Sequence, residues 1–328
     1  MPDLPITVHS LKNLRPMSQH AGLSGAELLR AELADGTAVV VKRSHADSDF
    51  FQRLLGHRVN LEYQLWADGT FDLLPQGASS PLIAAWVDGD NATLVMRDLG
   101  EGILGGHHAF TRDECKRLLR RLDELHRSGI RPAKTTSLDA IVNTFSLARV
   151  RSADPSASIL HDIERGWEAF LHLAPQGVGH QVLEVAQRPD ALVRALALRS
   201  PSFCHGDVAA VNMAWRGDQL VLIDWGQVFI GPAALDIARF LPSGLRSSAI
   251  DNDWFLEQYA IVADDRFDER ALRLSLLATL VWYGWRKALD ATEGPDPALM
   301  SIEKAGILWW CERAAAGLRE LSSRSPGN

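Results

Sequence analysis

The pattern of apolar residues changes near residue 100, and this change limits the folds that the chain can adopt. Residues 26–99 contain short β-like segments around one helical segment, whereas helical patterns dominate from Thr111 onward. A length of 328 residues suggests two lobes, at roughly 150 residues per domain. The sequence therefore predicts an α+β fold with a small antiparallel, β-rich N-terminal lobe and a larger, mainly helical C-terminal lobe.

Two hairpins and one helix are expected in the β-rich part. The turn Asp35-Gly36 precedes a β-branched run that ends at Lys42, which is typical of a hairpin. A second hairpin is expected around the Asp-Gly-Asp-Asn turn at 88–91. Between them, residues 49–66 place apolar side chains at helical spacing and predict one amphipathic helix, with residue 47, 48 or 49 as its N-cap.

The helical part contains a clear helix start and one β-like interruption. Thr111 and Glu114 form a capping-box pattern, and Gly129 is expected to end the helix that begins there. The interruption covers residues 203–231, where a hairpin is expected to turn at Gly217-Asp218.

Composition limits the partners and the compartment. The 34 Lys and Arg residues against 41 Asp and Glu give a net charge of -7 without a basic block, so no nucleic-acid partner is expected. The most apolar stretch, 274–285, is too short to span a bilayer, and no export signal is visible, so no membrane partner is expected. The three cysteines form no CxxC pair, which favours a reducing cytoplasm. The oligomeric state stays open.

The segment 203–226 carries the most specific chemical pattern. It contains His205-Gly-Asp207, Asn212 five residues after that aspartate, and Asp224 in an Ile-Asp-Trp-Gly sequence. Phosphoryl transfer from a nucleotide needs a carboxylate near the acceptor hydroxyl and oxygen ligands for Mg²⁺. These three side chains could supply both, so the spacing predicts a phosphotransferase site.

Through HGDVAAVN at 205–212 and IDWG at 223–226, the chain resembles the aminoglycoside phosphotransferase and choline kinase-like family, which is related to protein kinases. The resemblance extends over nearly the whole chain and implies a protein kinase-like two-lobe fold. It implies an N-lobe at 1–96 that binds the nucleotide and a hinge at 97–100. The C-lobe at 101–328 would then hold the catalytic loop, the Mg²⁺ site and the acceptor pocket.

The resemblance also implies roles for single residues. Asp207 would be the catalytic base, and Asn212 and Asp224 would hold Mg²⁺. The nucleotide would be bound by a small-lobe loop, a strand lysine with its helix glutamate, and the hinge, here Ser24, Gly25, Lys42, Glu62, Met96, Asp98 and Leu99. Hinge contacts would come from backbone groups, which leaves GTP open beside ATP.

Some of these residues also have a simpler interpretation. Lys42 at a strand end could be a surface lysine, but a helical glutamate downstream favours a paired, phosphate-binding lysine. His205 is expected to orient the catalytic loop rather than to transfer a proton. By the resemblance, Asp236 would support that loop, and its simpler role is a carboxylate at a helix N-terminus.

The acceptor pocket is expected beyond residue 230, where two features are ambiguous. Seven acids lie between 251 and 270 against two arginines, which could attract a cationic acceptor or form a solvated helix face. Half of the ten tryptophans lie past residue 250. Two roles are open for the pocket candidates Trp282, Trp285, Trp309 and Trp310. Their rings could stack on a sugar or a quaternary ammonium, or they could pack in the core.

The sequence thus predicts an ATP-dependent kinase that phosphorylates a hydroxyl of an aminoglycoside-, sugar- or amino-alcohol-like molecule, in antibiotic resistance or in metabolism. The alternative is a nucleotide-binding pseudokinase or regulatory protein without transfer activity. A serine hydrolase is excluded because Gly22-Leu-Ser24-Gly25 is not a G-x-S-x-G motif. A protein kinase is disfavoured because only four residues separate Gly226 from Gly231-Pro232, which leaves little room for an activation loop.

Overall fold

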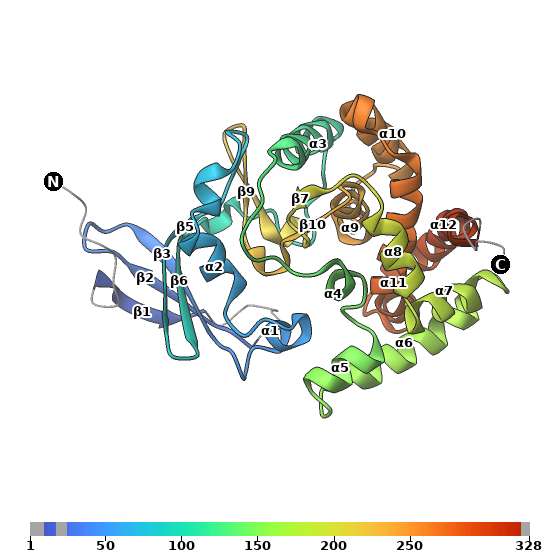
Figure 1. Cartoon of the computed structure of the whole chain (residues 1–328), viewed down its shortest axis with the longest axis horizontal. Helices are drawn as coiled ribbons and strands as arrows, with labels where there is room; N and C mark the ends of the chain where they lie inside the picture. The colour runs from blue at the N-terminus through green and yellow to red at the C-terminus, as the bar shows by residue number, and fades with distance from the viewer. Residues whose placement is uncertain (1–9, 18–24, 323–328) are drawn as a thin grey trace.

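The computed structural model describes residues 10–17 and 25–322, and it contains one larger sheet and two small ones. The larger sheet lies at the left in Figure 1 and has the strand order β1-β2-β3-β6-β5, with antiparallel neighbours throughout. Its strands are β1 (Lys12–Pro16), β2 (Glu27–Glu32), β3 (Ala38–His45), β5 (Leu82–Asp88) and β6 (Asn91–Arg97). Both expected hairpins, β2-β3 and β5-β6, are therefore confirmed.

The prediction of a single helix over residues 49–66 is wrong, because the segment forms two short helices. Helix α1 spans Phe50–Leu55 and α2 spans Leu61–Ala67. Gly56 ends α1 in the left-handed conformation, with φ 79°, and Asn60 starts α2 by accepting a hydrogen bond from Tyr63 N. Asp49 is the N-cap of α1. The break at Gly56 lets the two helices point in different directions.

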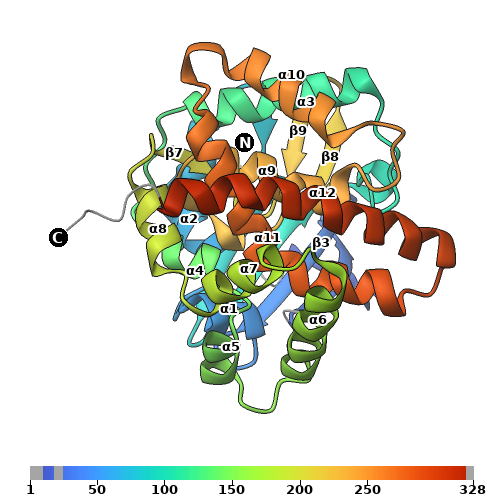
Figure 2. The same ribbon diagram turned by 90° about the vertical axis from the view of Figure 1, so that its right-hand side faces the viewer.

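The larger part of the chain is helical, as predicted. Its helices are α3 (Arg112–Arg127), α4 (Leu138–Val142), α5 (Leu147–Ala153), α6 (Ile159–Leu173), α7 (Val178–Gln187), α8 (Asp190–Ala197), α9 (Ala234–Gly244), α10 (Asn252–Ala263), α11 (Glu269–Glu293) and α12 (Pro297–Ser322). The capping box of Thr111 and Glu114 is present at the start of α3. Figure 2 shows α12 lying across α11 at the end of the molecule away from the larger sheet.

Two small sheets lie between the larger sheet and these helices. One pairs β7 (Ser202–Cys204) with β10 (Phe229–Gly231). The other contains the predicted hairpin, β8 (Met213–Arg216) and β9 (Gln219–Leu222), with β4 (Ala78–Ser79) added parallel to β9. The segment 205–212 therefore runs directly from one small sheet into the other.

The apolar core is divided unequally. A small cluster lies in the larger sheet and includes Val39, Val41 and Val95. The main cluster lies among the helices, and it also takes in Leu54 of α1 and Leu65 of α2. Both short helices are thus packed onto the C-terminal core although they precede residue 96 in sequence. Within residues 10–17 and 25–322, no helix combines the length and apolar character needed to cross a membrane.

Candidate active site

The loop that carries Asp207 is held in place by the carboxylate of Asp236 of α9. The backbone N–H groups of His205 and Gly206 donate to Asp236 Oδ2 and Oδ1, each at 2.9 Å. Gly206 has φ 87°, and a Cβ there would lie 2.2 Å from the carbonyl oxygen of Gln227. Glycine is therefore required at this position for both its conformation and its lack of a side chain. The contacts agree with the loop-supporting role that the resemblance implies for Asp236.

His126, in the last turn of α3, completes this support, although no role was predicted for it from the sequence. Its Nε2 lies 3.0 Å from Asp236 Oδ2, and both side chains are almost fully buried. Although burial raises the pKa of Asp236, its hydrogen bonds, first among them that with His126, bring the pKa below its usual range. The only sequence signal for His126 was its core position on an amphipathic helix. A histidine at such a position is more often structural than functional.

His205 connects Asp207 to the segment that carries Asp224. Its Nε2 lies 3.1 Å from the carbonyl oxygen of Ile223, and its Nδ1 lies 3.3 Å from Asp207 N. A neutral ring that donates from Nε2 and accepts at Nδ1 satisfies both contacts. Burial lowers the pKa of His205, which favours this neutral form. The contacts match the expected orienting role rather than proton transfer.

Asp207 and Asn212 are in direct contact. Asn212 Nδ2 donates to the backbone oxygen of Asp207 at 3.1 Å and to its Oδ2 at 2.9 Å. Burial, together with the negative charge of Asp224, raises the pKa of Asp207 to about 6. A carboxylate with such a pKa is ionised at neutral pH and is a stronger base than an exposed aspartate.

Asp224 brings the two parts of the site together. It adopts the left-handed conformation, with φ 62° and ψ 59°, directly after Ile223, whose N–H donates to the Asn212 carbonyl oxygen at 3.0 Å. Lys42 Nζ lies 2.8 Å from Asp224 Oδ1 and 2.7 Å from Glu62 Oε1. Residues from β3, α2 and the loop after β9 therefore converge on one point.

Lys42, Asp224 and Glu62 shift one another's pKa values. Although burial favours the neutral form of Lys42, the carboxylates of Asp224 and Glu62 raise its pKa above the usual range. The charge of Lys42 lowers the pKa of Asp224, whereas burial raises the pKa of Glu62. Glu62 also accepts a hydrogen bond from Trp225 N at 3.2 Å. The lysine is therefore held in place by two carboxylates, one on α2 and one on the loop after β9.

The residues present fit a magnesium ion. Mg²⁺ prefers oxygen ligands. Asn212 Nδ2 faces Asp207, so Oδ1 points elsewhere, and the Asp224 side chain is half exposed (50%), with Oδ1 on Lys42. In the part of the chain that the structure describes, Asn212 Oδ1 and Asp224 Oδ2 accept no hydrogen bond, so both oxygens are available to a cation.

The family model described as the phosphotransferase enzyme family matches residues 39–275. This range covers well over half of the chain and includes Lys42, Glu62 and the whole segment 205–224. The chain belongs to the phosphotransferase enzyme family. The predicted enzyme class, a phosphotransferase with an alcohol group as acceptor, is thereby confirmed. A search of curated proteins found no match.

Solved structures of phosphotransferases are similar to this one. An aminoglycoside-3'-phosphotransferase of type VIII is 18% identical, with a TM-score of 0.51 over 82% of this chain and 93% of that one. The GDP complex of aminoglycoside 2'-phosphotransferase-IIIa is 16% identical, with a TM-score of 0.51 over 93% of each chain. A choline/ethanolamine kinase family protein from Mesorhizobium loti is 14% identical, with a TM-score of 0.50 over 98% and 96%. These similarities concern the fold, and the predicted kinase-like two-lobe fold is confirmed.

The expected nucleotide-binding loop and hinge of this phosphotransferase are only partly defined by the structure. Ser24 lies outside the described residues, and Gly25 has φ 76°. Met96 is in β6, and Leu99 follows that strand. The N–H of Asp98 donates to the Ala38 carbonyl oxygen at 3.1 Å, so this amide is already occupied. The proposed nucleotide contacts of these residues stay predictions.

Four tryptophans were predicted as pocket residues: Trp282, Trp285, Trp309 and Trp310. None of them is among the residues that line the cavity at Asp207. Trp285 and Trp310 are only 4% and 2% exposed, so their indoles pack in the core, which is one of the two roles that the sequence left open. Trp309 Nε1 donates to Asp253 at 3.1 Å on the side of α12. Trp282 stacks beneath Arg239, whose guanidinium carbon lies 4.2 Å from the ring centroid. The tryptophans fill the contacts of α11 and α12 instead.

Arg239 was not predicted from the sequence, and its guanidinium contacts the loop that carries Asp207. It donates to the Gly206 carbonyl oxygen at 2.8 Å, to Gln227 Oε1 at 3.1 Å and to the Ile141 carbonyl oxygen at 2.6 Å. Burial lowers its pKa to about 10, which still leaves it charged at neutral pH. Arg239 therefore joins the catalytic loop to α4.

Part of the acidic run at 251–270 has structural roles. The carboxylates of Asp251 and Asp268 are N-caps of α10 and α11, and Asp253 is paired with Arg313. These contacts agree with a helix-terminal role rather than with an acceptor site.

Two cavities stand out among the described residues. One, of about 80 Å³, is lined by Asp207, Asp224, Lys42 and residues around α1. A larger one, of about 320 Å³, lies between the α4-α5 connection, α6 and α7, and no predicted site residue lines it. The smaller cavity is therefore the one that predicted site residues line.

Proposed function

We propose that this phosphotransferase is a Mg²⁺-dependent kinase that transfers the γ-phosphoryl group of ATP to a hydroxyl of a small molecule. The observation that carries the proposal is the convergence of Lys42, Glu62 and Asp224 on one point. Asp207 and Asn212 are in contact with each other, and a backbone hydrogen bond from Ile223 to Asn212 joins them to Asp224. A phosphate-binding cation, metal-ligating oxygens and a base then surround a single space.

Asp207 is the group that acts on the acceptor. Its carboxylate, with a pKa of about 6, accepts the proton of the acceptor hydroxyl and orients its oxygen towards the phosphorus atom. Asn212 holds Oδ2 of this carboxylate by its side-chain amide, which leaves Oδ1 for the hydroxyl. The support from Asp236 and Arg239 fixes the loop, so little reorganisation is needed when the acceptor binds.

Lys42 binds the phosphates of the nucleotide, and Glu62 keeps it in position. Asn212 and Asp224 would hold Mg²⁺, which supplies positive charge to the phosphate oxygens when it is bound. The GDP complex of aminoglycoside 2'-phosphotransferase-IIIa supports nucleotide binding by this fold and keeps GTP as an alternative to ATP.

The acceptor is proposed to be an aminoglycoside-, sugar- or amino-alcohol-like molecule. The names of the similar structures support this range, since they include aminoglycoside phosphotransferases and a choline/ethanolamine kinase family protein.

An acceptor-dependent turnover assay tests the proposal. Purified protein is incubated with Mg-ATP or Mg-GTP and a panel of aminoglycosides, amino alcohols and sugars, and release of the nucleoside diphosphate is measured. We expect at least one compound class to stimulate release, and Asp207→Asn to reduce it by on the order of 10²–10⁴. Unchanged turnover in Asp207→Asn would refute the role of the base.

A nucleotide-binding regulatory protein is the alternative. It predicts binding of Mg-ATP by calorimetry without a phosphorylated product from any compound in the panel. The presence of all the groups that the chemistry needs favours the kinase.

A further inference from the structure

One wall of the cavity that contains Asp207 comes from the N-terminal part of the chain. Phe51 and Leu55 of α1 and His57 just after it line this cavity together with Asp207 and Gln227. We call these three side chains the α1 wall. Phe51 and His57 are half-buried, so part of each side chain faces open space. The sequence pattern predicted an acceptor pocket beyond residue 230, whereas this wall precedes residue 60.

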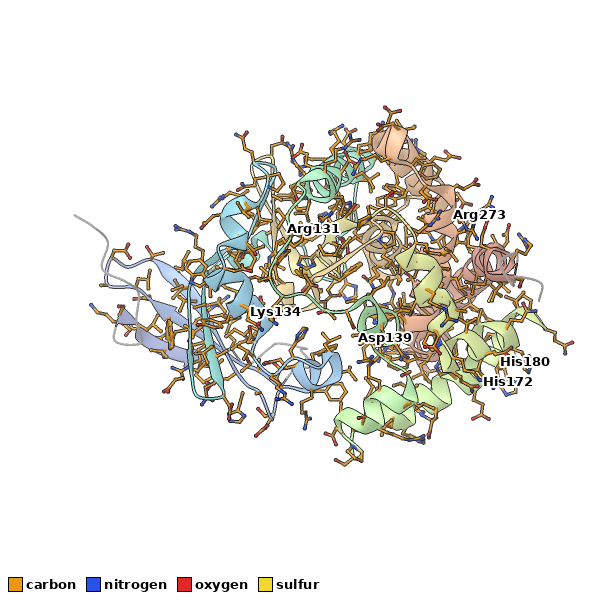
Figure 3. The ribbon with its side chains drawn as sticks, in the orientation of Figure 1. Arg131, Lys134, Asp139, His172, His180 and Arg273 are labelled. Carbon is orange, nitrogen blue, oxygen red and sulfur yellow. The ribbon has the colours of Figure 1, made fainter. Side chains whose placement is uncertain are left out.

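The α1 wall is fastened to the C-terminal lobe. Arg149 of α5 donates to the Leu54 carbonyl oxygen at 3.2 Å and pairs with Asp139 of α4 at 2.5 Å. Arg53 lies 3.4 Å from Asp154 at the end of α5. Figure 1 shows α1 beside α4 and α5, and Figure 3 labels Asp139 on α4. These contacts keep the wall at a constant position relative to the C-terminal lobe.

His57 and Phe51 add two further contacts to this lobe. His57 Nε2 lies 2.8 Å from Thr136 Oγ1, on the segment between α3 and α4 that includes Lys134 in Figure 3. The ring of Phe51 packs edge-on against Phe145, with a centroid distance of 6.2 Å. The wall is thus a preorganised surface beside the base rather than a free helix.

The charges around this cavity exclude one class of acceptor. Of the described residues that line it, the acids are Asp49, Glu62, Asp207 and Asp224, and the one lysine is Lys42, which is held by two of those carboxylates. Burial lowers the pKa of His57, so the ring is neutral at pH 7. Even with Glu62 neutral, the three aspartates outnumber Lys42, and Mg²⁺ would be held by Asp224 and by the phosphates of the nucleotide. An acceptor that carries a carboxylate or a phosphate would therefore meet negative charge here without a cation of its own.

We propose that the α1 wall binds the acceptor and selects an uncharged or cationic alcohol with an apolar face next to the reacting hydroxyl. Phe51 and Leu55 cover that apolar face, and the neutral ring of His57 borders it. The inference rests on the proposed function, because it concerns the acceptor of the same base. It assigns acceptor selectivity to α1 rather than to the tryptophans of α11 and α12.

Matched probes test the charge preference, and they can be used before the natural acceptor is identified. Three alcohols share a phenyl group next to a hydroxyl: 2-amino-1-phenylethanol is cationic, 1-phenyl-1,2-ethanediol is neutral and mandelate is anionic. Their binding to the full chain, with Mg²⁺ and a non-hydrolysable ATP analogue present, is measured by calorimetry. We expect the cationic and neutral probes to bind at least about tenfold more tightly than mandelate. Equal or tighter binding of mandelate would overturn the proposal.

Paired variants test the wall itself. Phe51→Ala is compared with Phe50→Ala, since Phe50 is also half-buried in α1 but does not line the cavity. His57→Ala is compared with His180→Ala, since His180 is exposed on α7, far from α1 in Figure 3. We expect only Phe51→Ala and His57→Ala to weaken binding of the neutral probe, by about tenfold, with nucleotide affinity unchanged. Equal effects within each pair, or no effect in any variant, would overturn the proposal.

The same variants separate this inference from the proposed function. If wild-type protein transfers phosphate to a compound of the turnover panel, Phe51→Ala should raise the KM for that compound more than it lowers kcat. If no compound is phosphorylated, the proposed function fails, whereas the calorimetric comparison of Phe51→Ala with Phe50→Ala still decides whether α1 binds the probes.

Discussion

Lys42 Nζ contacts Asp224 Oδ1 at 2.8 Å, although the two residues are 182 positions apart in the chain. The proposed phosphate-binding cation and a proposed metal ligand are therefore paired with each other. Glu62, at 2.7 Å, holds the lysine from the other side. A nucleotide with its metal ion must share or replace the contact with Asp224, whereas the contact with Glu62 can persist.

This arrangement predicts that Lys42→Met impairs both nucleotide binding and folding. The variant leaves Glu62, which is only 4% exposed, without its cation. Removing one partner of a buried pair costs about 3–5 kcal/mol. The cost is reduced here because burial raises the pKa of Glu62 and favours its neutral form. Thermal unfolding and nucleotide calorimetry measure the two effects. The double variant Lys42→Met/Glu62→Gln should regain stability but not nucleotide affinity, and a single variant as stable as wild type would contradict this interpretation.

Asp207→Asn is predicted to stabilise the protein at neutral pH while it removes the base. The folded protein holds the proton of Asp207 up to a pKa of about 6, whereas an unperturbed aspartate loses it near 3.8. Stability therefore falls as the pH rises through this window, and the loss is complete above pH 6. Asparagine carries no charge and avoids this loss. The melting temperature of the variant should exceed that of wild type at pH 7.5, and the difference should shrink as the pH falls from 6 towards 4.

The same pKa predicts the acid side of the rate profile. Only the ionised carboxylate of Asp207 can accept the proton of the hydroxyl. The value of kcat/KM, which reports the free enzyme, should fall about tenfold per pH unit below about pH 6. Because bound Mg²⁺ would lower the pKa of Asp207 by its positive charge, the fall should begin at a lower pH at saturating than at limiting Mg²⁺. A profile that stays level down to pH 5 at limiting Mg²⁺ would argue against Asp207 as the base.

His126 is predicted to act as a positioning residue through Asp236. In His126→Leu, the buried carboxylate loses its side-chain partner at 3.0 Å and keeps only its two backbone donors. The loss of a hydrogen bond to a buried charged group costs about 1–3 kcal/mol. We expect a lower kcat, by roughly tenfold, with nearly unchanged affinity for the nucleotide. If the double variant His126→Leu/Asp236→Asn regains stability, the uncompensated carboxylate of Asp236 is the cause of the loss. A rise in KM without a fall in kcat in His126→Leu would contradict a positioning role.

Two glycines with positive φ offer a matched test of the catalytic loop. Gly206 has φ 87° and a Cβ there would lie 2.2 Å from the Gln227 carbonyl oxygen, whereas at Gly217, with φ 61°, no atom lies within 4 Å of such a Cβ. Gly217→Ala should cost only about 1–2 kcal/mol and leave activity intact. Gly206→Ala should displace the loop and abolish turnover. Equal activity in the two variants would show that the loop tolerates a side chain.

The local features of the sequence were sufficient to predict much of the fold. Turns at Asp35-Gly36 and Gly217-Asp218, and the capping box at Thr111, are contained in a few neighbouring residues, and the structure has them where they were expected. The order Asp207, Asn212 and Asp224 was also readable, because these residues lie on one short segment around a hairpin. The break at Gly56 was missed because apolar spacing continues through it, although its left-handed conformation ends the helix.

The chain order alone determined which residue types could perform phosphoryl transfer, namely a base, two oxygen ligands and a lysine. Only the tertiary structure decided which distant side chains hold them in place. His126 reaches Asp236 across 110 positions and Arg239 reaches Gly206 across 33, and no local pattern marks such pairs. Burial likewise placed Trp285 and Trp310 in the core and left Phe51 at the cavity that Asp207 also lines. Periodicity shows that a side chain is apolar, but the packing of helices decides whether it faces the core or a cavity.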